Sequence, residues 1–298
     1  MTEAKAELKG VRTVPQRPIR PRELEDPLNY HVYHPLAWQL ARLLARTPLT
    51  PNMVSVAGGI TVVIAGICYT ELAWPVSALL GMALHMAWHV IDGADGDLAR
   101  MTGRTSPRGE MIDGLCDYSS HIVLYILLAM FLEGQIGWIA WPIAILAGVA
   151  HAIQSNHVEA QRRFYLYWIY GKPWLNNQRG DTGGLFGWLV TQYLRVAAGM
   201  TPHALQIDAA ITAAKGDPAR LETLRAPIRA EAGRLLKIEK MLGPNQRAIV
   251  LGAAMFLTNS PLAYFAFGGL WLTALLAFSV AAHNAAARRI AERVAALA

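Results

Sequence analysis

Four aspartates fall within one short stretch of the sequence, at separations that suit a helical chain. Asp92 and Asp95 are three residues apart, and Asp113 and Asp117 are four apart. Residues at these separations share one face of an α-helix. We therefore expect two helices that each present a pair of carboxylates. A linker of about a dozen residues would let the helices fold side by side, so that the four carboxylates converge.

Small and basic residues accompany the carboxylates. Gly96 and Ala99 lie near the face of the first pair, Gly109 precedes the second pair by four residues, and Arg100 extends the first helix. The small residues leave space beside the carboxylates, and a guanidinium offers a fixed fork of donors to a phosphate. Asp97 falls off the shared face, so we assign it no catalytic part.

Carboxylates gathered in this way repel one another unless a cation compensates them. An aspartate at the centre of a membrane span also costs about 2.5–3.5 kcal/mol on insertion scales. Hard divalent cations prefer oxygen ligands, so Mg²⁺ fits the cluster and Mn²⁺ is the alternative. Two such ions about 3.5–4 Å apart would clamp a diphosphate. The stretch therefore predicts a two-metal site for phosphate chemistry.

The composition indicates which elements carry this site. Of the 298 residues, 54% are hydrophobic and only 16% are charged, and the charges are clumped. This pattern predicts an all-α integral membrane protein with six transmembrane helices, each near the ~20 residues that a ~30 Å hydrocarbon core requires. We expect the spans at 53–73, 75–95, 110–133, 137–158, 246–264 and 267–287.

Basic residues predict the orientation of the spans. Every second connection lacks Lys and Arg, and the other connections contain them, as the positive-inside rule requires. Both termini and the aspartates would then face the cytoplasm, and we expect a bacterial inner membrane. The net charge of +6 has its explanation in this topology, so we expect membrane lipids and no nucleic acid as partners.

The remaining segments complete the predicted organisation. A long cytoplasmic insertion is predicted at 160–245, between the fourth and fifth spans. It contains a predicted surface helix at 185–199, a solvated helical hairpin at 217–241, and an interfacial aromatic belt that includes Tyr165 and Trp168. The predicted divisions are a disordered tail at 1–22, an amphipathic interfacial helix at 23–49, the first four spans at 50–159 with the catalytic motif at 92–117, a helical cytoplasmic insertion at 160–245, and the last two spans with a C-terminal tail at 246–298.

The aspartate stretch resembles the signature of the CDP-alcohol phosphotransferase (CDP-alcohol phosphatidyltransferase) family, D-x2-D-G-x2-A-R-x8-G-x3-D-x3-D, at every fixed position. The resemblance implies a phospholipid-biosynthetic transferase that moves a phosphatidyl or other phosphoalcohol group from a CDP-linked donor to an acceptor alcohol and releases CMP. We expect CDP-diacylglycerol as the donor, because membrane burial suits a lipid. A homodimer would also fit the family.

The resemblance also implies roles for individual residues. Asp92, Asp95, Asp113 and Asp117 would ligate the metals, and Asp117 would also act as the base that takes the proton from the acceptor hydroxyl. The residues implied in binding the CDP donor are Asn52, Ser55, Gly96, Ala99, Arg100, Ser106 and Gly109.

Two alternatives remain open at this point. A soluble CDP-alcohol could be the donor and a lipid the acceptor, or the protein could be a membrane cation transporter with a carboxylate-lined site. A membrane prenyltransferase is disfavoured, because its aspartate motifs lie far apart in the sequence. The long insertion lies near where acceptor selectivity is expected, so no particular acceptor follows from the resemblance.

Overall fold

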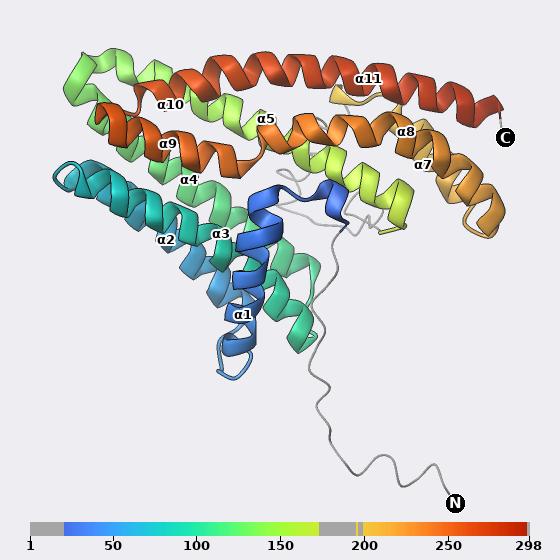
Figure 1. Cartoon of the computed structure of the whole chain (residues 1–298), viewed down its shortest axis with the longest axis horizontal. Coiled ribbons are helices and arrows are strands. Elements are labelled where there is room, and N and C mark those ends of the chain that lie inside the picture. The colour runs from blue at the N-terminus through green and yellow to red at the C-terminus, as the bar shows by residue number, and fades with distance from the viewer. Residues whose placement is uncertain (1–20, 173–194, 196–198, 297–298) are drawn as a thin grey trace, which may run out of the picture.

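The computed structural model of this protein describes residues 21–172, 195 and 199–296, and these residues form helices and no strand. The predicted tail up to residue 20 and most of the predicted surface helix at 185–199 lie outside them. The principal helices are α1 (His34–Leu44), α2 (Pro51–Glu71), α3 (Val76–Thr102), α4 (Pro107–Ile136), α5 (Ala140–Tyr170), α7 (Ala204–Ala213), α8 (Pro218–Leu242), α9 (Pro244–Thr258), α10 (Leu262–Ala266) and α11 (Leu272–Ala296) (Figure 1).

Helix α2 packs along both α3 and α4, whereas α3 and α4 approach each other closely at few points. Glycines make this packing tight. A Cβ added to Gly66 of α2 would lie 2.9 Å from a methyl group of Leu127, and one added to Gly81 of α3 would lie 2.5 Å from the ring of Tyr69. A Cβ at Gly81 would displace the Tyr69 ring, and one at Gly66 would displace the ends of leucine side chains on α4, so both glycines allow α2 to pack closely on the two aspartate-bearing helices.

The buried apolar residues form two large cores. One joins α2, α3, α4, the first half of α5, α9 and α10 around Leu128 and Leu251. The other joins the last turns of α5 to α7, α8 and α11 around Trp168, Ile228 and Ile290. Helix α5 has 31 residues, which makes it about 46 Å long at 1.5 Å per residue. It is therefore longer than a ~30 Å hydrocarbon core and has length left over for the second core.

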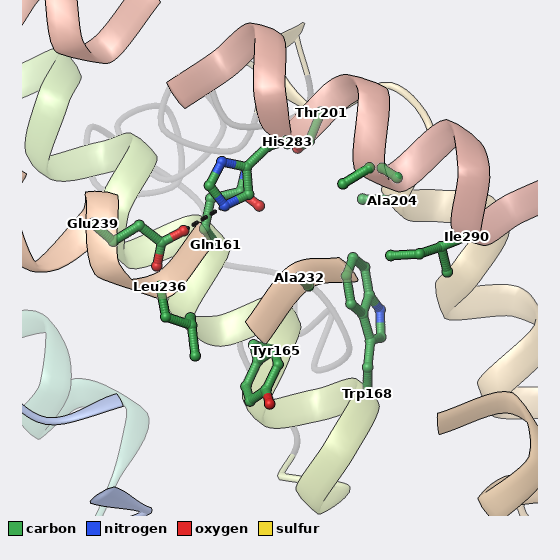
Figure 2. Close-up of a pocket in the computed structure, with 12 residues that line it drawn as sticks. Gln161, Tyr165, Trp168, Thr201, Ala204, Ala232, Leu236, Glu239, His283 and Ile290 are labelled. Atoms are coloured by element: carbon green, nitrogen blue, oxygen red, sulfur yellow. Dashed lines mark ion pairs between the residues drawn. The ribbon is translucent and has the colours of Figure 1, made fainter. Parts of the chain in front are cut away.

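A small cavity of about 20 Å³ lies in the second core, between α5, α8 and α11. Figure 2 shows Glu239 and His283 facing each other at one end of it, and Trp168 and Ile290 at the other. The Glu239 carboxylate lies 2.7 Å from Nε2 of His283. Helix α8, which carries Glu239, is thereby tied to α11.

Among the residues that the structure describes, three helical stretches are long and apolar enough to cross a membrane: Pro51–Glu71, Arg108–Tyr170 and Leu262–Ala296. The second contains both α4 and α5, joined through the turn Gly137–Ile139. Helix α3 falls outside this set because polar residues such as His85, His89 and Asp92 lower its hydropathy. Helix α9 has only 15 residues. The predicted count of six spans is therefore not confirmed.

Several predicted boundaries were wrong for identifiable reasons. The segment 246–264 is not one helix, since Asn259 with φ 47° ends α9 in a left-handed turn. Residues 217–241 form no hairpin, because Asp217 caps the single helix α8, which continues through Pro227 to Leu242. Helix α5 runs on past residue 159 to Tyr170, so the predicted division between the first four spans and the insertion falls within a helix, and that division stays a prediction.

The predicted aromatic belt was also wrong. Tyr165 and Trp168 are only 2% and 4% exposed, because α7, α8 and α11 cover them. They are therefore core residues of the second bundle. Tyr165 keeps its hydroxyl satisfied by donating to Glu23 at 3.0 Å.

The N-terminal segment is helical from the turn Asn29–Tyr33 through α1. Ala37 and Ala41 are fully buried against Ala94 and Leu98 of α3. Leu43 on α1 is 61% exposed. An amphipathic helix therefore exists within 23–49, but its location at a membrane interface stays a prediction.

Candidate active site

A short joint between α3 and α4 brings the two aspartate pairs together. Gly103 ends α3 in the left-handed region, with φ 67°, where a residue without Cβ is favoured. Ser106 begins α4, because its hydroxyl accepts from the backbone N–H of Gly109 at 3.0 Å. The two predicted helices therefore form, and the joint between them is residues 103–106, shorter than the predicted linker.

Three of the four predicted carboxylates lie together in one group. Asp92, Asp113 and Asp117 each offer an oxygen atom, and these atoms all lie within 4.8 Å of one another. Asp95 lies outside this group of three. Its side chain is buried, and Oδ2 accepts a very short hydrogen bond from the hydroxyl of Ser55 on α2.

The donor set fits a hard divalent cation. All three ligand atoms are carboxylate oxygens, which suit Mg²⁺ and Mn²⁺ and do not suit softer metals that select sulfur or imidazole. Asp92, Asp113 and Asp117 would hold such an ion, which would neutralise phosphate charge there. Like-charged groups this close together repel unless a cation lies between them.

Asp117 receives a hydrogen bond that the sequence analysis missed. The indole Nε1 of Trp88 on α3 donates to Asp117 Oδ1 at 3.2 Å. Nδ1 of His121, one turn along α4, lies 2.8 Å from the backbone oxygen of Asp117. The available signal was the position of Trp88 four residues before Asp92, which places both side chains on one face of α3.

Arg100 lies beside two of its motif neighbours. Its Nη2 donates to Asp97 Oδ1 at 2.5 Å, and Asp97 is only 4% exposed. The guanidinium passes over Gly96, where an added Cβ would lie 3.4 Å from Nη1. Asp97, which helical geometry excluded from the carboxylate face, thus holds Arg100 beside Gly96.

The other residues implied in donor binding fall into two groups. Asn52, Ser106 and Gly109 lie together, since a Cβ on Gly109 would be 3.3 Å from the Ser106 hydroxyl and 3.7 Å from Asn52 Oδ1. Ser55 is engaged with Asp95, and Ala99 is half-buried on α3. Their part in binding a CDP donor stays a prediction.

A buried guanidinium lies deeper in the same bundle. Arg247 of α9 is 2% exposed, and its Nη2 donates to Gln154 Oε1 at 2.6 Å. Nε and Nη1 have no hydrogen-bond partner among the described residues. The ring of His151, one turn before Gln154 on α5, lies 5.8 Å from that of His121, so polar side chains extend from Asp117 toward Arg247.

Long apolar helices together with a candidate divalent-cation site between α3 and α4 define the class of the protein as an all-helical protein of membrane type. Residues 48–168 match the model of the CDP-alcohol phosphatidyltransferase family. The matched residues include all four aspartates, and the family comprises transferases of substituted phosphate groups.

A named relative agrees with the family match. A stretch of 95 residues is 34% identical to the archaetidylinositol phosphate synthase of Aeropyrum pernix. The stretch covers 30% of this chain and 47% of the relative, so the match spans about half the length of that protein. The α7–α8 layer lies outside the family match at 48–168.

Proposed function

We propose that this protein transfers a phosphatidyl group from CDP-diacylglycerol to the hydroxyl of an acceptor alcohol and releases CMP. The observation that carries the proposal is the group of three carboxylate oxygens, from Asp92, Asp113 and Asp117, within 4.8 Å of one another. A site of this kind binds a divalent cation and through it a diphosphate. The family match at 48–168 supports a CDP-linked donor.

The residues support the following reaction sequence. Asp117 accepts the proton of the acceptor hydroxyl, and the resulting alkoxide oxygen attacks the phosphorus distal to the cytidine. The bond from that phosphorus to the bridging oxygen breaks, and the oxygen leaves with CMP. Arg100, released from Asp97, holds the phosphate of the departing nucleotide. A bound Mg²⁺ or Mn²⁺ would neutralise charge on the phosphates, and Asp95 would complete the carboxylate set.

The acceptor in this proposal carries an anionic group. Arg247 is buried, and no ion pair joins it to a carboxylate within the part of the chain that the structure describes. A buried charge without a partner is costly, and an anion would satisfy both its Nε and its Nη1. The name of the relative specifies a product with an inositol phosphate group, which agrees with a phosphorylated acceptor.

The membrane arrangement belongs to the same proposal. We take α2, α3, α4, α5, α9 and the α10–α11 segment as the six spans, with the aspartates on the cytoplasmic side. Arg104 lies in the joint next to the aspartates, and Arg108 lies just after that joint. Basic residues at this place support the orientation. The relative comes from an archaeon, so the proposed location is a cell membrane in general. The homodimer stays a prediction.

Release of CMP tests this function directly. Purified protein is incubated with Mg²⁺, CDP-diacylglycerol and a panel of acceptors with and without a phosphate group. We expect CMP release that needs the phosphorylated acceptor and that stops on chelation of the metal. CMP release only with a water-soluble CDP-alcohol and a lipid acceptor would reverse the roles of the two substrates. No CMP from any donor would refute the proposal and favour the cation transporter.

A further inference from the structure

Trp88 is not a position of the aspartate motif, but its side chain contacts Asp117. Its indole N–H donates to Oδ1 of the carboxylate at 3.2 Å, and the residue is 6% exposed. We infer that Trp88 is a positioning residue for Asp117, which fixes the orientation of this carboxylate in the site. This inference rests on the proposed function of Asp117 as base and metal ligand.

The indole is held from several sides. The ring of His121 contacts it edge-on with centroids 4.7 Å apart, and the ring of His89 lies at 4.5 Å. A Cβ on Gly58 of α2 would lie 3.6 Å from Cδ1 of the indole, so α2 packs against its remaining edge. A donor confined in this way cannot follow a rotating carboxylate, and it therefore selects one orientation of Asp117.

The consequence concerns the two oxygens of the carboxylate. With Oδ1 bound to the indole N–H, the plane of the carboxylate is set, and Oδ2 is the oxygen that we expect to meet a cation or the acceptor hydroxyl. The indole is neutral, so it orients the carboxylate without cancelling the negative charge that the chemistry needs. Groups that orient a metal ligand in this way commonly affect metal affinity or activity by 10- to 100-fold, as an order of magnitude.

A buried indole N–H needs an acceptor in any protein, so the contact could serve only the packing of Trp88. The chain offers a matched control for that case. Trp141 of α5 donates its Nε1 to Glu133 Oε2 at 2.9 Å, which is the same indole-to-carboxylate bond at the opposite end of α4 from the aspartates. The two bonds orient different carboxylates, and the bond of Trp141 lies at a more exposed place.

The experiment compares wild-type protein with Trp88→Phe and Trp141→Phe. Two quantities are measured: Mn²⁺ affinity without substrates, from the electron paramagnetic resonance of the free ion, and steady-state CMP release. We expect Trp88→Phe to lower kcat about tenfold or more and to weaken Mn²⁺ binding, with the donor KM changed less than about twofold. Trp141→Phe should leave both quantities unchanged.

A further variant removes the N–H alone. Replacement of Trp88 by 3-benzothienylalanine puts sulfur in place of the N–H and keeps the ring size, so it tests the hydrogen bond even if Trp88→Phe does not fold. The same losses are expected. Wild-type kcat and Mn²⁺ affinity in this variant would overturn the inference. Wild-type protein that binds Mn²⁺ but releases no CMP would instead overturn the proposed function, and the Mn²⁺ affinities would still decide the role of Trp88.

Discussion

Two groups of ionisable side chains lie among the helices, and they are built in opposite ways. Between α3 and α4, three carboxylates of like charge meet within 4.8 Å. Between α5, α8 and α11, the Glu239 carboxylate meets His283 at 2.7 Å, and His157 Nε2 lies 2.9 Å from the hydroxyl of Ser279. The first group gathers one sign of charge, and the second pairs acid with base.

We infer from this difference that the aspartates bind a ligand and that the Glu239–His283 pair stabilises the fold. Burial raises the pKa of the Glu239 carboxyl, and the adjacent His283 acts in the opposite direction. The pair is thus compensated within the protein and connects two helices, as Figure 2 shows. The aspartates combine like charges, which only a cation from outside the chain can balance. We therefore expect substitutions in the first group to abolish activity and substitutions in the second to lower stability.

The largest expected effect is that of Asp117→Asn. The amide cannot accept the proton of the acceptor hydroxyl, so kcat should fall about 10³-fold or more, within the range for loss of a general base. The thermal unfolding midpoint should not fall, since one like charge is removed from the cluster. Glu110→Gln, which changes an exposed acid on the same helix, is the control and should keep most of the activity. Wild-type CMP release by Asp117→Asn would contradict its role as base.

The next effect concerns the paired group. Glu239→Gln leaves His283 buried without its carboxylate, which should lower the free energy of unfolding by about 3–5 kcal/mol. Activity per folded molecule should stay near that of the wild type. Thermal unfolding in detergent, followed by circular dichroism, measures the loss.

An exposed ion pair between the same two helices is the control for that variant. Arg289 lies 2.8 Å from Glu231, and Glu231→Gln should cost less than about 1 kcal/mol because solvent screens the pair. If Glu239→Gln lowered kcat in the folded protein while the unfolding temperature stayed constant, the division between a catalytic and a structural group would break down.

A smaller effect is expected at Arg247. Arg247→Met removes the buried guanidinium that the proposal assigns to the anionic acceptor, so the acceptor KM should rise about 10- to 100-fold, as for a lost hydrogen bond to a charged group. The donor KM should change little. Arg225→Met removes a half-buried guanidinium that bonds to the backbone of Trp168, and it should leave both KM values unchanged. Equal increases in donor and acceptor KM for Arg247→Met would argue against an acceptor subsite.

The smallest effect is a pH dependence of the second core. Burial raises the pKa of Asp208 on α7 to about 6, although the Trp168 indole N–H donates to it at 2.5 Å. A raised pKa means that the protonated acid stabilises the fold, and this stability is lost as the pH rises from about 4 through about 6. Asp208→Asn should remove that part of the dependence and unfold at a temperature a few degrees higher at pH 7. Parallel pH profiles for the two proteins would contradict the assignment.

The sequence by itself determined the helical class and the aspartate pairs. Spacings of three and four residues place Asp92 beside Asp95 and Asp113 beside Asp117 on any helix, because such spacings depend only on the local geometry of the backbone. The same local rules account for the helix start at Ser106 and Pro107 and the helix end at Gly103. These features need no knowledge of the distant chain.

Only the tertiary structure decided how the site is supported and where the second core lies. Trp88 on α3 donates to Asp117 on α4, and Ser55 on α2 donates to Asp95 on α3. Trp168 is buried by segments more than 30 residues away in the chain. No local pattern specifies such contacts, because they depend on how whole helices pack. The four aspartates could thus be found from their spacing, whereas the groups that orient them became visible only after α2, α3 and α4 were assembled.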